Sequence, residues 1–154
     1  RLLWFENGKI KGKTVYSKGI KNGSDRGWNN NGNPKWAFRW KGNKEHGPQI
    51  EWGEQGLKLY EHNFANGVAH GKFIEYFPGG QKRQSGTFKS GVQQGEWTWW
   101  YLDGEIALSG NYTMDVPTGT WIWVMVERQD LTMKDDPEPA WVQSRIQEWL
   151  KVSQ

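Results

Sequence analysis

Two histidines occupy equivalent positions in this chain, and such a pair could in principle hold a metal ion. His46 and His70 are 24 residues apart, and the same spacing continues to Gln94 and Thr118. If each 24-residue unit is a hairpin, equivalent side chains are separated by two strands, or about 9–10 Å. Glutamine and threonine are also poor zinc ligands. We therefore expect no metal site, and interpret both residues as loop histidines and His62 as a hydrogen-bonded core histidine.

Paired carboxylates could provide acid–base chemistry, and Glu51 and Glu75 recur at the same spacing. One repeat apart, they are too distant to act as a glycosidase pair within one hairpin. The chain has no cysteine, no nucleophile paired with a base and no phosphate-binding glycine loop before a helix. We expect no catalytic residue, no cofactor, no small-molecule substrate and no enzymatic activity.

The twelve tryptophans could stack on sugars or on single-stranded nucleic acid. Carbohydrate binding stays open as a minor alternative. Nucleic acid is not expected, because Lys9, Lys11 and Lys13 point away from the face that the nearby aromatic residues are predicted to occupy.

The elements that carry these residues repeat every 24 residues from Trp4 to about Val124, without insertion or deletion. Four columns define the repeat: Trp4, Trp28, Trp52, Tyr76, Trp100 and Val124; Tyr16, Trp40, Phe64, Phe88 and Tyr112; Gly8, Gly32, Gly56, Gly80 and Gly104; and Gly23, Gly47, Gly71, Gly95 and Gly119. Units that cannot bury their apolar face alone must stack on their neighbours. The period predicts one elongated domain over residues 1–126.

Each unit has two alternating runs separated by a turn dipeptide, which predicts a β-hairpin. The tip at Asp103-Gly104 favours a three-residue loop with a bulge, in which the glycine has a positive φ. This register would pair Trp100 with Ile106, and Thr98 with Leu108. We therefore expect a mainly β fold, a solenoid-like row of antiparallel hairpins.

Alternation in both strands places the core on the even-numbered face, with Trp52, Tyr76 and Trp100 in one buried row. The odd-numbered face changes from polar to aromatic along the chain. Exposed aromatic residues at this density are typical of an interface. The predicted interaction surface comprises Trp97, Trp99, Tyr101, Trp121 and Trp123, with Trp141 and Trp149 from the tail.

The C-terminal tail has a different pattern from the repeats. A polar linker over 127–136 precedes an amphipathic α-helix over 137–152, in which Val142, Ile146, Trp149 and Leu150 share one face. This helix could cap the aromatic odd face of the last repeats or bind a partner.

Charge is unevenly distributed, although the net charge is only +3. Residues 1–60 contain twelve Lys and Arg against five Asp and Glu, and residues 61–154 contain eight against twelve. A basic surface can bind an anionic membrane, although a solvated sheet face is the simpler interpretation. The candidate contacts are Lys9, Lys11, Lys13, Lys18 and Lys21.

The segment from Gly86 to Gly104, GTFKSGVQQGEWTWWYLDG, resembles the MORN repeat, specifically the bacterial variant of antitoxin-like and exported repeat proteins. The match recurs over 64–80 and 40–56 and covers about residues 4–124. Two features depart from the family's usual repeat: Gly71-Lys-Phe73 and Gly95-Glu-Trp97 replace Gly-x-Gly, and the period is one residue longer. The resemblance implies a row of hairpins that binds proteins or acidic phospholipids, without catalytic residues.

The expected function is therefore a non-catalytic interaction or scaffold module, an accessory subunit of a larger assembly. Peripheral binding to an anionic membrane and an antitoxin or immunity role are the alternatives. A start at Arg1 suits either a processed signal peptide or a chain that lacks its true N-terminus. Of the two, we expect an exported protein, periplasmic or secreted.

Overall fold

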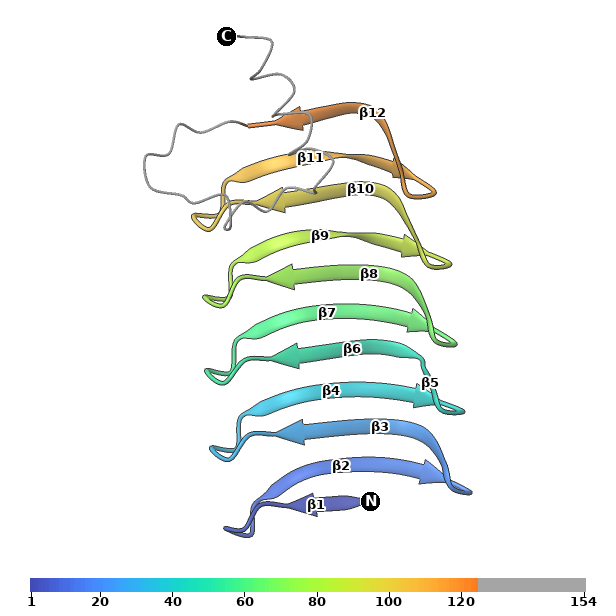
Figure 1. The fold of residues 1–154 in the computed structure, drawn as a ribbon, viewed down its shortest axis with the longest axis vertical. Helices are drawn as coiled ribbons and strands as arrows, with labels where there is room; N and C mark the ends of the chain where they lie inside the picture. Colours follow the sequence, from blue (N-terminus) through green and yellow to red (C-terminus); the bar gives the residue numbers. More distant parts are fainter. Residues whose placement is uncertain (125–154) are drawn as a thin grey trace, which may run out of the picture.

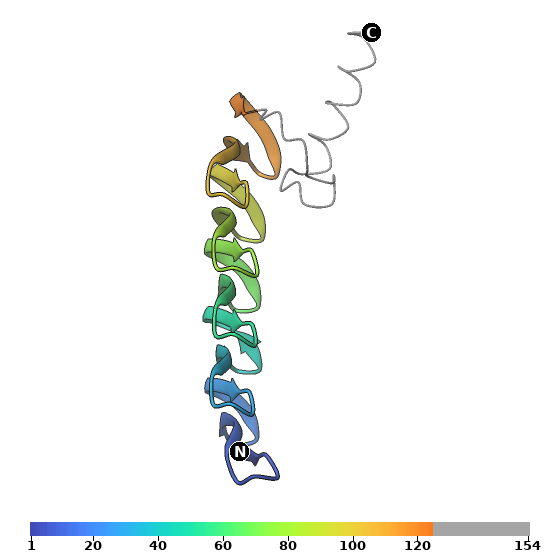
Figure 2. The same cartoon turned by 90° about the vertical axis from the view of Figure 1, so that its left-hand side faces the viewer.

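The computed structural model describes residues 1–124, which form one 12-stranded antiparallel sheet of consecutive hairpins (Figure 1). The strands are β1 Leu2–Trp4, β2 Ile10–Ser17, β3 Ile20–Trp28, β4 Pro34–Lys41, β5 Lys44–Glu45, β6 Gly47–Trp52, β7 Lys58–Ala65, β8 Val68–Tyr76, β9 Lys82–Lys89, β10 Val92–Trp100, β11 Ile106–Thr113 and β12 Val116–Trp123. Each strand pairs with the next along the chain, except that β6 pairs with β4 and the short β5 also pairs with β4. The described part is a long single layer (Figure 2).

Residues 1–124 contain no helix, and therefore none that could span a membrane. The polar linker over 127–136 and the helix over 137–152 lie outside the described residues.

The predicted three-residue turns lie along one side of the sheet, at the ends of the strands. At the tip of β10 and β11, the Gly104 amide donates to the Tyr101 carbonyl at 3.0 Å, and the Tyr101 amide donates to the Glu105 carbonyl at 2.8 Å. Gly104 has a φ of +90°. The turn prediction is confirmed at all five tips, since the glycines with positive φ include Gly8, Gly32, Gly56, Gly80 and Gly104.

Two-residue turns lie along the opposite side of the sheet, and they also link successive hairpins. Asn66 and Gly67 both have positive φ, at 54° and 84°, as a type I′ turn requires. The Gly67 amide donates to the Glu45 carbonyl of the preceding hairpin at 2.8 Å, and the Gly91 amide donates to the Ala69 carbonyl at the same distance. Neighbouring hairpins are therefore joined at their turns as well as along their strands.

The strand register corrects part of the predicted pairing. Trp100 pairs with Ile106 as predicted, but Thr98 pairs with Ser109 and not with Leu108. A β-bulge lies opposite the step from Trp99 to Trp100, where Ala107 of β11 is the extra, unpaired residue. Beyond it the pairing is shifted by one residue, so odd-numbered residues of β10 pair with even-numbered residues of β11. Equivalent bulges precede the aromatic column in the other hairpins, at Trp4, Trp28, Trp52 and Tyr76.

The predicted core face is therefore wrong for the first strand of the last hairpins. Odd-numbered Trp97 and Trp99 are 1% and 3% exposed, whereas even-numbered Ile122 is 60% exposed. In the second strand, Leu108 and Tyr112 are buried as predicted. The bulge explains the difference, because it brings odd residues of one strand onto the same face as even residues of the next. Even-numbered Ile74 is buried, as predicted. Four other residues predicted to lie on the buried face are half-buried or exposed: Trp52, Tyr76, Trp100 and Ile106.

The turn glycines give a test of backbone conformation. Replacing Gly104 by alanine is expected to cost about 1–2 kcal/mol, because a β-carbon is strained at positive φ, and nothing else lies within 4 Å of that carbon. Replacing Gly56 by asparagine is expected to cost less, since asparagine tolerates this conformation better. Urea unfolding of the two variants measures the difference. Equal losses would show that backbone strain does not set the cost.

Candidate functional site

A continuous row of rings runs across one face of the sheet from β7 to β12. We call this face, which carries Gln49, His62, Phe73, Phe88, Trp97, Trp99, Leu108, Tyr112 and Trp121, the aromatic face. Trp97 stacks on Phe73 and on Trp99, with ring centroids 5.8 and 5.9 Å apart. Phe88 and Tyr112 meet Trp97 edge to face, at 5.1 and 6.2 Å. Such offset and perpendicular geometries are the favourable ones for aromatic pairs.

Glycines in neighbouring strands allow these tryptophans to lie flat on the sheet. A β-carbon on Gly86 would lie 2.1 Å from the Trp97 ring, and one on Gly110 would lie 2.1 Å from the Trp121 ring. No side chain could occupy either position without displacing the indole. The aromatic face is therefore filled over β9 to β12 by large rings packed directly on backbone.

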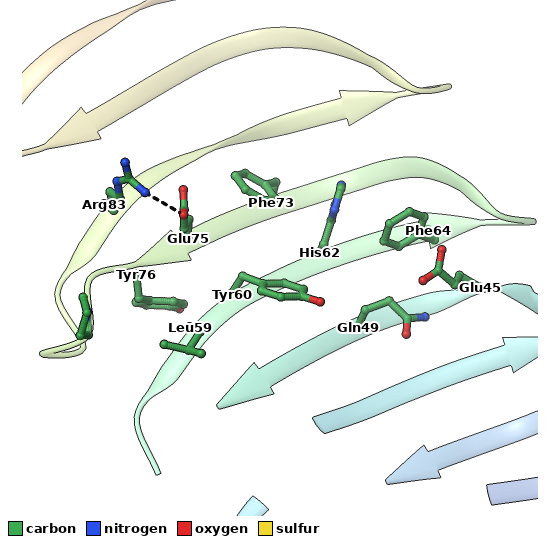
Figure 3. Close-up of a pocket in the computed structure, with 11 residues that line it drawn as sticks. Glu45, Gln49, Leu59, Tyr60, His62, Phe64, Phe73, Glu75, Tyr76 and Arg83 are labelled. Atoms are coloured by element: carbon green, nitrogen blue, oxygen red, sulfur yellow. Dashed lines mark hydrogen bonds and ion pairs between the residues drawn. The ribbon is translucent and has the colours of Figure 1, made fainter. Parts of the chain in front are cut away.

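The middle of the aromatic face is less filled and forms a groove of about 580 Å³ over β5 to β9 (Figure 3). This volume is within the range typical of ligand sites. The groove is lined by Glu45, Gln49, Leu59, Tyr60, His62, Phe64, Phe73, Glu75, Tyr76, Pro78 and Arg83.

Three side chains from successive strands cross the groove as one row. Gln49 of β6 pairs with His62 of β7, which pairs with Phe73 of β8. The His62 ring lies against Phe64 and Phe73, with centroids 4.4 and 5.0 Å apart. Gln49 is 2% exposed, and its amide donates to the Arg39 carbonyl at 2.8 Å. The row is the counterpart of the tryptophans further along, with smaller side chains that leave space above them.

Carboxylates surround this row. The Arg83 guanidinium donates to Glu75 at 3.0 Å, and the Gln84 amide donates to the other Glu75 oxygen. Burial raises the pKa of Tyr60 to about 12, and the nearby carboxylates of Glu51 and Glu45 add to the rise. The groove therefore offers aromatic rings and carboxylate acceptors to a ligand.

His62 differs from its expected role as a hydrogen-bonded core histidine. Its Nε2 atom is buried and has no hydrogen-bond partner among residues 1–124. Burial lowers the pKa of the imidazole below its ordinary value of 6.5, so the folded protein favours the neutral ring.

This shift predicts a pH dependence of stability. The unfolded chain binds a proton at His62 more readily than the folded chain, so the free energy of unfolding should fall as pH decreases below about 6.5. The loss should continue down to the lower pKa of the folded state. His62→Gln should remove this component, while leaving the acid loss below about 4 that Asp25 contributes. Urea unfolding between pH 7 and 4.5 measures it, and an unchanged pH slope in the variant would contradict the assignment.

The predicted interaction residues are mostly covered. Trp97, Trp99 and Tyr101 are 1%, 3% and 7% exposed, and Trp121 and Trp123 are half-buried. The first three therefore present little surface here. Their role in binding stays a prediction, and the more open part of the aromatic face lies at the groove. Trp141 and Trp149 lie outside the described residues.

The predicted basic residues separate into two groups. Lys9, Lys11, Lys13 and Lys18 are exposed. Lys21 instead binds the buried Asp25 at 2.9 Å and lies 4.3 Å from the centre of the Trp40 ring.

Asp25 stays charged in this environment. Burial alone would raise its pKa, but hydrogen bonds from Lys21, Thr14 and Trp36 outweigh that effect and hold the pKa below its ordinary value. Lys21 therefore belongs to a structural ion pair and contributes less to any basic surface.

His46 and His70 have a structural role beside the two-residue turns. His46 lies between β5 and β6, as predicted for a loop histidine, whereas His70 lies in β8 and corrects that prediction. Their Nδ1 atoms accept hydrogen bonds from the amides of Asn66 and Ser90, each at 3.3 Å, in the turn of the next hairpin. Within residues 1–124, no three His, Asp or Glu side chains are grouped as a metal site.

Two kinds of residue at this site are not predicted from the sequence. Gly86 and Gly110 lie outside the turn columns, and each precedes a tryptophan by eleven residues. A glycine inside a strand marks a close approach, so this spacing is a usable signal. Gln49 and Glu45 carry no comparable signal, because the groove depends on which side chains neighbouring strands bring together. Compared with known proteins, the chain matches no family model and no curated sequence.

Proposed function

We propose that this protein is a non-catalytic interaction module that binds an extended segment of a partner protein along the groove of the aromatic face. The observation that carries the proposal is the groove itself, where rings and polar groups from the five strands β5 to β9 line one open surface (Figure 3). Aromatic side chains with a few placed polar groups are typical of binding sites. The MORN-like repeat in the sequence supports the same proposal, since proteins of that type bind other proteins.

A long single-layer sheet suits this function. Strands that stack by nearest-neighbour contacts give an extended surface, and the segment bound can span several hairpins. An accessory subunit needs such a surface more than it needs a deep enclosed cavity.

Position-specific photo-crosslinking in the native source tests the proposal. A photoreactive phenylalanine analogue replaces Pro78, an exposed residue at the rim of the groove. The matched control replaces Glu96, which is exposed and alternates with Trp97, so that it lies on the opposite face. A crosslinked partner is expected from position 78 and not from position 96. No product at position 78, or equal products at both, would contradict binding in the groove.

Binding to an anionic membrane is the second candidate, favoured by the exposure of Lys9, Lys11, Lys13 and Lys18 near one end of the sheet. Its test is co-sedimentation with phosphatidylserine vesicles in low and high salt. Replacing the four lysines by glutamine should abolish binding, and wild-type binding should fade as salt increases. Binding that resists salt would exclude this mode.

A further inference from the structure

The floor of the groove contains one buried hydrogen-bond acceptor that has no donor among residues 1–124. The Gln49 side-chain oxygen is buried and has no partner among residues 1–124, although the amide nitrogen of the same group is satisfied by Arg39. An unsatisfied buried acceptor destabilises the folded chain, because it has lost its hydrogen bonds to water. A ligand that donates a hydrogen bond here would offset that loss.

The charges around the floor are also unbalanced. Glu45 is half-buried and makes no side-chain hydrogen bond or ion pair with any described residue. Glu75 is already neutralised by Arg83. The remaining ionisable groups add no positive charge, because His62 favours its neutral form. The groove therefore carries one uncompensated negative charge, although the whole chain has a net charge of +3.

The walls beside this charge are aromatic. Phe64 and Phe73 lie on either side of His62, and Tyr60 also lines the groove. The face of an aromatic ring attracts a cation, and an arginine guanidinium can stack on a ring while donating several hydrogen bonds. Rings, a free carboxylate and an unsatisfied acceptor are together complementary to a cationic donor.

We propose that the groove binds a basic side chain, arginine above all, carried by the extended segment of the partner. This inference rests on the proposed function and adds the chemistry that the partner must supply. The guanidinium would pair with Glu45, stack against the rings and approach the acceptor of Gln49. An acidic segment is disfavoured, because the one cation among the residues that line the groove, Arg83, is already engaged by Glu75.

Selection from a displayed library of random 12-residue peptides tests the inference without knowledge of the natural partner. The bait is the full chain, and the counter-bait is the Glu45→Gln variant. Glu45 has no side-chain partner to lose among residues 1–124, so this change keeps the size and removes only the charge. We expect selected peptides to be enriched in arginine or lysine at one position. The matched control is Glu54→Gln, which removes an exposed carboxylate outside the groove.

The best selected peptide is then synthesised with arginine or with citrulline, which has nearly the same shape and no charge. Fluorescence anisotropy is expected to show about tenfold weaker binding for citrulline, and a similar loss for Glu45→Gln with the arginine peptide, the size of one charge-assisted hydrogen bond. Glu54→Gln should leave the affinity unchanged.

The outcomes separate this inference from the proposed function. The inference is overturned if the selected peptides lack basic residues and bind equally well to Glu45→Gln. If position 78 still yields a crosslinked partner, the proposed function stands. Equal affinities of the citrulline and arginine peptides would also overturn the inference. If no peptide is selected and position 78 yields no crosslink, both the inference and the proposed function are contradicted. Binding to phosphatidylserine vesicles alone would favour the membrane mode and contradict both.

Discussion

Replacing Trp97 by alanine is expected to lower the free energy of unfolding by about 3–5 kcal/mol, the range for a fully buried aromatic side chain. Trp97 is 1% exposed and contacts Phe73, Phe88, Trp99 and Tyr112. Its removal leaves a cavity next to four rings, and the glycine beneath it has no side chain to fill the space. Urea unfolding followed by circular dichroism measures the loss.

Trp100→Ala is the matched control, since it removes the same type of side chain from a nearby position in the same strand. Trp100 is half-buried, and the ammonium group of Lys82 lies 5.4 Å from its ring centre. The control should lose clearly less stability than Trp97→Ala. Equal losses would show that the odd-numbered face is not the core, and would restore the even-face prediction.

Gly86→Ala is expected to cost about 1–3 kcal/mol, the usual cost of overpacking. The new methyl group would lie 2.1 Å from the Trp97 ring, so the indole or the backbone must move. Gly12→Ala is the control, because its new carbon would meet no atom closer than 3.6 Å. That change should stay within about 0.5 kcal/mol of the parent, or stabilise slightly by restricting the unfolded chain.

A double variant identifies the cause. In a Trp97→Ala background, Gly86→Ala should cost little, because the ring that it meets is gone. The coupling between the two positions is then nearly the whole cost of the single glycine change. Independent, additive effects would mean that backbone strain at residue 86, rather than contact with the indole, destabilises the variant.

The hairpin architecture is predictable from sequence because it depends on local backbone chemistry. Gly104 adopts positive φ because the three-residue turn needs it, and a similar dipeptide at every tip specifies the same turn. The pairing of Trp100 with Ile106, closest to the turn, is predictable for the same reason. Such features require only neighbours along the chain.

The side of the sheet that forms the core is not predictable in the same way. A bulge before Trp100 shifts the register by one residue, and no turn residue marks it. Period-2 alternation is sensitive to a single insertion, so one bulge reverses the assignment for the rest of the strand. The even-face prediction is wrong because it assumes that residues pair one to one from the turn to the far end of the strand.

The candidate site likewise depends partly on local sequence and partly on contacts between strands. The sequence alone determined a row of hairpins, its turn glycines and an abundance of aromatic residues, because each follows from a repeated local pattern. The packing of Trp97 over Gly86 is a property of the tertiary structure. So is the row that Gln49, His62 and Phe73 form across three strands beside Glu45. Those contacts depend on cross-strand register and on which face each side chain occupies, and both are set by pairing between strands rather than by the order of residues within one.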